Sequence, residues 1–317
     1  MMKKAVVIML LCLSFAPTAV EAQDSDNVFN FLRLPASAHV SAIGGDNITL
    51  AENDASLVFH NPALINYVSD MTMNLNMMTY MEGSVTASAS FAKALGDRAT
   101  WGVQGRFISY GEMKETTVTG EQTGTFGARD VALSGTFAYG LADRLSGGVT
   151  AKMVGSFIGS YSSLGVCVDL GLNYYDDERE WSISAVARNL GGQVKAYEDD
   201  FEPVPLDLQL GVSKRLIGSP LRFHATLVRL NDWEYGLGKH LVLGADLMLG
   251  EQFYIAAGYN PLRASQMKIS SGDSESSHGA ALSLGAGMTL ERLQLHFAYA
   301  KYHVSSTSLM LTFSYIL

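Results

Sequence analysis

The sequence predicts an all-β transmembrane antiparallel β-barrel of about 14 strands with an N-terminal plug, or hatch, segment. Two observations support this fold class. From Met71 to Leu317, stretches of about ten residues alternate apolar with small or polar side chains, a period of two that is typical of strands with one apolar face. The connections between these stretches are alternately short and long, which is typical of bacterial outer-membrane barrels.

Residues 1–22 have the features of a signal peptide. Lys3 and Lys4 precede an apolar run from Ala5 to Ala16, and Val20-Glu21-Ala22 offers the small residues that a signal peptidase recognises. The run is too short to span a bilayer. We therefore expect export, with the mature chain beginning near Gln23.

Cysteine content and charge exclude several classes of protein. Cys167 is the only cysteine after Gln23, so no intrachain disulfide is expected. The formal net charge is −9, and removing Lys3, Lys4 and Glu21, net +1, makes it −10. An acidic chain argues against a nucleic-acid partner. No run of 18 apolar residues occurs, so no transmembrane helix is expected.

Residues 23–69 form a distinct segment because they do not alternate. They contain apolar stretches and the sequence Asn61-Pro62-Ala63, which suggest short helical turns and loops. We expect this segment to fold into the lumen as a plug ahead of a barrel at residues 70–317. The alternative is a periplasmic tail.

The alternation places the strands along the rest of the chain. The predicted ranges are 70–80, 85–95, 99–110, 130–141, 144–154, 162–175, 180–190, 205–216, 220–229, 240–249, 252–260, 279–290, 292–301 and 306–317. Long outer loops are expected at 111–129, 191–204, 230–239 and 261–278, with a mobile stretch at 265–278. An even number of strands places both barrel termini in the periplasm.

The strand faces separate a lipid side from a lumen side. In the last strand, Leu309, Leu311 and Phe313 share the apolar face. The same assignment predicts these lumen residues: Gln104, Arg106, Lys152, Asp169, Arg188, Asp207, Arg222, His224, Asp246, Gln294 and His296. We expect the charged ones to pair with one another and with the plug, because unpaired charges are costly in a narrow lumen. A polar conduction path or ligand site is the alternative.

No catalytic residue, cofactor or metal ligand is predicted. His224 and His296 could suggest an outer-membrane hydrolase, but no nucleophile elbow accompanies them. The carboxylates of Asp24-Ser25-Asp26 and Asp176-Asp177-Glu178 lack the spacing and glycine of a calcium loop. We expect a non-enzymatic protein.

Aromatic residues mark the two rims. Trp101 and Trp181 begin strands beside short turns, where an aromatic girdle is expected. Trp233 and Tyr235 lie in the loop 230–239 and are the predicted anchors for a partner, since Trp and Tyr dominate binding hot spots. Alternatively, Trp233 belongs to the outer girdle.

The strand number and the N-terminal motif resemble the FadL-like superfamily of outer-membrane barrels. The motif is Asn61-Pro62-Ala63, preceded by Asp54-Ala55. Within that superfamily the chain most resembles the PorV/PorQ family of the type IX secretion system, on the PorQ side. The stretches that carry this resemblance are Leu34-Pro35-Ala36-Ser37-Ala38, Gly44-Gly45, Ala187-Arg188-Asn189-Leu190-Gly191, Leu208-Gln209-Leu210-Gly211-Val212, Leu230-Asn231-Asp232-Trp233, His240-Leu241-Val242-Leu243-Gly244 and Gly258-Tyr259-Asn260-Pro261-Leu262-Arg263.

The resemblance implies a non-enzymatic anchor in the cell outer membrane. Its expected partners are a surface protein resembling PorZ, the attachment-complex components PorU and PorV, and outer-membrane lipid or lipopolysaccharide. The alternative is a FadL-like transporter of small hydrophobic molecules. The predicted lumen residues are small or polar rather than aromatic, which weakly disfavours a pocket for a hydrophobic molecule. To that extent the sequence favours the anchor.

Overall fold

The structure is a computed structural model that describes residues 27–81, 83–233, 236–267, 269–271, 274–276, 279–304 and 306–317. The predicted signal peptide, the cluster Asp24-Ser25-Asp26 and the predicted partner residue Tyr235 lie outside the described residues.

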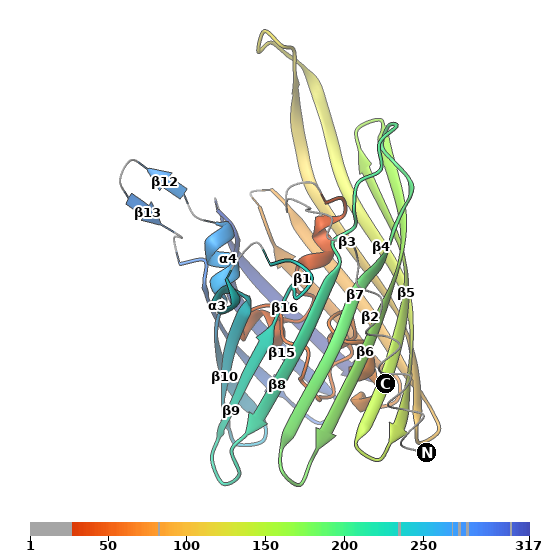
Figure 1. Cartoon of the computed structure of the whole chain (residues 1–317), viewed down its shortest axis with the longest axis vertical. Coiled ribbons are helices and arrows are strands. Elements are labelled where there is room, and N and C mark those ends of the chain that lie inside the picture. The colour runs from red at the N-terminus through yellow and green to blue at the C-terminus, as the bar shows by residue number, and fades with distance from the viewer. Residues whose placement is uncertain are drawn as a thin grey trace.

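Fourteen antiparallel strands form a closed barrel, which confirms the predicted fold class (Figure 1). Neighbours in the ring follow chain order, β11 pairs with β14, and β1 pairs with β16 to close the seam. The barrel strands are β1 (Thr72–Thr79), β2 (Val85–Leu95), β3 (Ala99–Thr116), β4 (Gln122–Ala142), β5 (Leu145–Ile158), β6 (Tyr161–Asp176), β7 (Trp181–Lys195), β8 (Asp207–Arg215), β9 (Leu221–Leu227), β10 (Leu241–Leu249), β11 (Phe253–Tyr259), β14 (Leu282–Thr289), β15 (Leu293–His303) and β16 (Ser306–Ile316).

The two faces of the barrel wall differ as the alternation predicts. On β16, Leu311 is 51% exposed whereas its neighbour Thr312 is fully buried. Large apolar side chains point outward around the ring, and small or polar side chains point inward. An apolar outer wall with every strand paired to its neighbours satisfies the backbone inside a bilayer.

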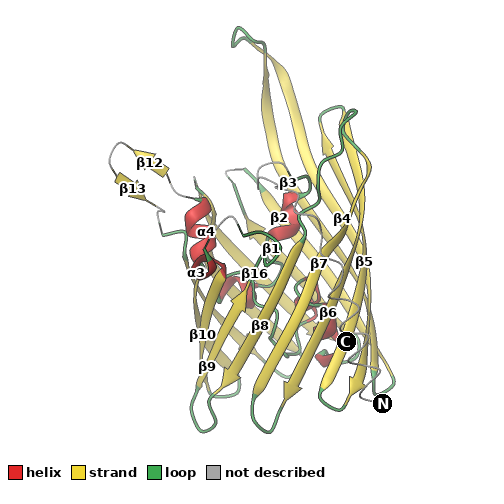
Figure 2. Cartoon of the chain, in the orientation of Figure 1, coloured by secondary structure: helices red, strands yellow, loops and turns green. Residues whose placement is uncertain are grey.

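Four short helices lie inside the ring of strands, all of them N-terminal to β1 (Figure 2). They are η1 (Asn30–Arg33), α2 (Ala38–Ala42), η2 (Ala55–Phe59) and η3 (Pro62–Tyr67). Asp54 caps η2 by accepting from the backbone N–H of Ser56, and Asn61 caps η3 by accepting from that of Ala63. Helix α2 contacts β14 and β15, and η3 contacts β4 and β5. We call residues 27–69 the inner segment.

Two predicted loop ranges are wrong in part. The sequence predicts a loop at 111–129, but β3 runs to Thr116 and β4 begins at Gln122, so the two strands form a hairpin that projects beyond the rim (Figure 1). Likewise, β7 continues to Lys195 within the expected loop 191–204. The projecting part of the hairpin is exposed on both faces, so its sequence needs no apolar alternation.

The remaining long connections contain further short elements. The loop after β9 includes α3 (Leu237–His240), and the loop after β11 includes α4 (Pro261–Gln266) and a separate hairpin of β12 (Ile269–Ser271) with β13 (Ser274–Ser276). None of the helices in the described residues is long and apolar enough to cross a membrane.

Candidate functional site

The inner segment runs through the lumen from one rim to the other. At the rim with the long loops, the backbone N–H of Val28 donates to the carbonyl of Pro203, with N and O 3.0 Å apart. At the rim with the short turns, the N–H of Leu317 donates to the carbonyl of Met71, just before β1. The start of β1 and the end of β16 therefore lie at the short-turn rim. The beginning of the inner segment lies at the long-loop rim.

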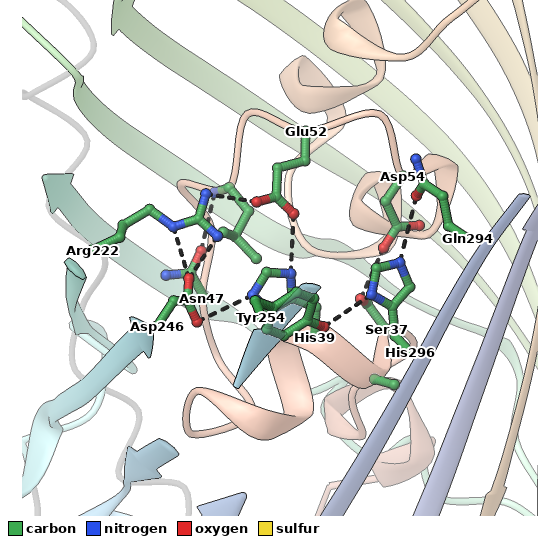
Figure 3. Close-up of polar contacts among 12 residues, drawn as sticks. Ser37, His39, Asn47, Glu52, Asp54, Arg222, Asp246, Tyr254, Gln294 and His296 are labelled. Carbon is green, nitrogen blue, oxygen red and sulfur yellow. Dashed lines mark hydrogen bonds and ion pairs between the residues drawn. The ribbon is translucent and has the colours of Figure 1, made fainter. Parts of the chain in front are cut away.

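A buried polar network joins the inner segment to the wall (Figure 3). Arg222 on β9 lies between Glu52 of the inner segment, 2.6 Å from Nη1, and Asp246 on β10, 2.7 Å from Nε. His39 on α2 lies between the same two carboxylates, with Nδ1 3.0 Å from Glu52 and Nε2 3.2 Å from Asp246. We call Arg222, Glu52, Asp246 and His39 the lumen network.

Aromatic and histidine side chains surround this network. The rings of His39 and Tyr254 stack with their centroids 4.0 Å apart, and Tyr254 Oη lies 2.9 Å from Nδ1 of His296. His224 Nε2 lies 2.9 Å from Asp246. Both predicted lumen histidines thus contact residues of, or next to, the lumen network.

Opposite charges balance within the network. Burial by itself lowers the pKa of His39, but the negative charges of Glu52 and Asp246 outweigh burial and raise the pKa to about 9. Burial works to raise the pKa of Glu52, yet Arg222 and His39 hold that pKa well below its usual range. At neutral pH the network therefore contains two cations and two anions, and it holds the inner segment by charge.

Further charged lumen residues pair as predicted from the sequence. Lys152 lies 2.7 Å from Asp169, and Arg188 lies 2.7 Å from Asp207. Arg106 donates through Nη1 to the carbonyls of Phe31 and Leu34 in the inner segment, at 3.2 and 2.9 Å. The expectation that lumen charges pair with each other and with the inner segment is confirmed.

The motif Asn61-Pro62-Ala63 packs against wall positions that lack side chains. A Cβ on Gly171 of β6 would clash with Oδ1 of Asn61, and one on Gly148 of β5 would clash with the carbonyl carbon of Pro62. Asn61 Nδ2 also donates to the carbonyl of Ile48, 3.0 Å away. Glycine at an inward position of a strand is the sequence signal for such a close approach.

A cavity of about 430 Å³ opens at the long-loop rim above the inner segment. Its lining mixes charged and aromatic residues, including Arg33, Asp46, Tyr80, Arg263 and Tyr302. The Arg263 guanidinium carbon lies 4.7 Å from the centroid of the Tyr302 ring, and its Nη1 donates to the carbonyl of Gly44 at 3.1 Å. The outer mouth of the lumen is therefore a polar vestibule.

Side chains that could bind a metal ion do not cluster in the part of the chain that the structure describes. Among the described residues, no three His, Cys, Asp or Glu side chains are placed to hold a metal ion. Asp176, in the acidic turn after β6, instead accepts from Arg144 at 2.7 Å. Buried Cys167 has a free thiol.

The predicted partner residue Trp233 lies in the connection between β9 and α3. It is 59% exposed, and its ring centroid lies 5.3 Å from that of His240. Its role as a partner anchor or as a girdle residue stays a prediction. Trp181, by contrast, begins β7 next to a short turn, as the girdle assignment requires.

These features define a class of protein: a closed outer-membrane type barrel of fourteen strands with a chain segment held inside. No protein-family model matches the sequence, and no curated protein matches it.

Solved structures share this fold at low sequence identity. The toluene transporter TodX of Pseudomonas putida matches with a TM-score of 0.59 at 12% identity, over 89% of this chain and 98% of that chain. The toluene transporter TbuX of Ralstonia pickettii matches with a TM-score of 0.57 at 13% identity, over 92% of this chain and 100% of that chain. A FadL homologue of Pseudomonas aeruginosa matches with a TM-score of 0.55 at 11% identity, over 89% of this chain and 98% of that chain. The chain thus has the FadL-like barrel fold.

Proposed function

We propose that this protein is a non-enzymatic outer-membrane channel for small hydrophobic molecules, in which the inner segment is the gate. The observation that supports it is the fold, which is shared along almost the full length of transporters named for toluene. The barrel would lie in the outer membrane with its short turns, and both barrel termini, in the periplasm.

A gate is needed because the inner segment fills the lumen. The inner segment is mostly buried and its charges are paired with the wall, so passage requires that the segment move. The vestibule of about 430 Å³ has the size of small-molecule sites and is the entry from the outside. The lumen network is the contact that such a movement must break.

Uptake of labelled toluene tests this proposal. Cells that make the full-length protein should take up toluene faster than cells with an empty vector, and deletion of Val28 to Asn66 should raise uptake and single-channel conductance further. A strain producing an unrelated barrel at equal abundance is the control. Equal uptake with and without the full-length protein would refute the channel.

A second proposal is an anchor in the type IX secretion system that holds a PorZ-like surface protein together with PorU and PorV. Two observations favour it: the resemblance to the PorV/PorQ family, and a rim that carries the β3–β4 hairpin, α3, α4 and the β12–β13 hairpin (Figure 1). The polar lumen wall also suits a plug better than an apolar route.

Recovery of partners separates the two proposals. If the protein is an anchor, purification from detergent-solubilised outer membranes should recover a large surface protein. Shortening 196–204, the part of the predicted loop 191–204 that follows β7, or 230–239 should then release that protein into the medium while the barrel still assembles. Changing Trp233 and Tyr235 to Ala tests the predicted anchor residues: lost retention with unchanged barrel stability supports an anchor, and the reverse supports a girdle. A channel predicts toluene uptake without a stable partner.

A further inference from the structure

The lipid-facing wall carries an apolar depression of about 520 Å³ that crosses β8, β9, β10, β11 and β14. Small side chains form its floor, because Ala245 pairs directly with Ala257 and Ala225 lies one row away. Phe223, Leu243 and Tyr259 stand beside these alanines, each between 46% and 49% exposed. We call this depression the wall furrow; its lining is almost wholly apolar.

One end of the wall furrow carries a cation. Lys214 is the residue before the last one of β8 and pairs with Trp181, and its Nζ lies 5.1 Å from the centroid of the Trp181 ring. The ammonium donates to the carbonyl of Arg179, which fixes its position and leaves two of its three N–H groups for another acceptor. Trp181 is the first residue of β7, so this end lies at the short-turn rim, where lipid headgroups meet a barrel.

The acidic residues of the neighbouring turn are not among the residues that line the wall furrow. Asp177, Glu178 and Glu180 line a separate cavity at the rim, together with Arg215. Lys214 is therefore the charged side chain that lines the furrow. An apolar trough that ends at an ammonium group and an indole ring complements an acyl chain attached to a phosphate.

We propose that the wall furrow binds one anionic glycerophospholipid, with an acyl chain along Ala225, Ala245 and Ala257 and the phosphate on Lys214. Apolar burial would hold the chain, and a charge-assisted hydrogen bond from Nζ to a phosphate oxygen would select the headgroup. This site is independent of whether the lumen conducts. It makes this sector of the wall a specific lipid contact rather than a general bilayer surface.

A second depression provides an internal comparison. It crosses β3 to β7 with a volume of about 710 Å³, and its outward-facing lining is uncharged: Val103, Leu133, Met153, Val166, Val168 and Leu190. Acyl chains that settle there gain no headgroup contact. Preference for an anionic lipid, rather than lipid binding as such, is therefore the property that tests the proposal.

Native mass spectrometry of the full-length protein in detergent tests it, with dioleoylphosphatidylglycerol and neutral dioleoylglycerol as probes. The wild type should retain the anionic lipid roughly tenfold more strongly, as expected for one charged hydrogen bond. K214Q should lose this preference and K214R should keep it. K93Q is the matched control, because Lys93 also pairs across strands with a tryptophan, Trp101, but lines neither depression.

A second pair of variants tests the trough. A257F fills the floor of the wall furrow and should abolish retention of the anionic lipid, whereas A89F, at another outward-facing alanine, should leave it unchanged. Folding of each variant is checked by the heat-dependent shift of the barrel on gels. An unchanged anionic preference in folded K214Q, or unchanged retention in folded A257F, would overturn the site.

Discussion

Arg222 on the wall and Glu52 on the inner segment form a buried ion pair, with Nη1 and Oε1 2.6 Å apart. The two residues are 170 positions apart in the chain, and Arg222 also bonds Asp246 on the next strand. The pair thus connects the inner segment to two strands of the wall at once.

Removing the acid of this pair should loosen the inner segment. Glu52→Gln leaves Arg222 with one carboxylate fewer, and we expect the free energy of unfolding to fall by roughly 1.5 to 3 kcal/mol, with a rise in single-channel conductance. Glu198→Gln, at an exposed position in the connection after β7, is the control. Equal conductance of the two variants would contradict the proposal that the ion pair of Glu52 with Arg222 holds the inner segment in place.

The protonation of His39 should make the stability of this contact depend on pH. The pKa of His39 is about 9 in the folded protein and about 6.5 in a free histidine, so its contribution is complete below pH 6.5 and is lost as pH rises through about 9. The urea midpoint should therefore fall between pH 7 and 10. His39→Gln should flatten this decline; an equally steep decline in that variant would assign it to other groups.

Two glycines with opposite surroundings test the contact of the Asn61-Pro62-Ala63 motif. Gly171→Ala places a methyl group against Asn61 and should shift the motif, raising conductance and protease cleavage within the inner segment. Gly135→Ala has nothing within 4 Å of its new methyl group and should behave as the wild type. Cleavage that is the same in both variants would mean that the motif does not hold the segment.

Depth in the bilayer should decide the cost of a charge on the outer wall. Leu311 and Leu95 are each 51% exposed, but Leu311 lies within β16 and Leu95 ends β2 at a short turn. Leu311→Arg should lower the free energy of unfolding by roughly 2 to 4 kcal/mol, and Leu95→Arg should lower it by at most about 1 kcal/mol. Both values are measured by reversible unfolding in lipid vesicles. The assignment of Leu311 to the membrane interior fails if the two costs agree.

The barrel was predictable because lipid imposes a repeating constraint on every spanning strand. The sequence from Leu309 to Ile316 alternates clearly, since one face meets acyl chains and the other the lumen. The sequence does not predict the projecting ends of β3 and β4, because Met113 and Thr125 lie beyond the wall in water, where no face must be apolar. The constraint ends at the membrane surface, and so does the sequence signal.

The lumen charges were predictable as a set but not as pairs. Asp246, Arg222 and His224 were assigned to the lumen from strand faces, whereas His39 and Glu52 lie in a segment without periodicity. Contacts between positions 39 and 246 depend on how the inner segment threads the ring, which no local pattern encodes. The close approach at Gly171 could have been inferred from a glycine on an inward strand face.

The seam between β1 and β16 has a consequence for the order of assembly. The inner segment bonds both of its strands: Ala38 N–H donates to Thr312 on β16, and Ala55 N–H donates to Asn74 on β1. These contacts bring together the first and last strands of the ring, which are more than two hundred residues apart. Because the same segment contacts both closing strands, we expect it to lie in place when the seam forms and to favour closure of the ring.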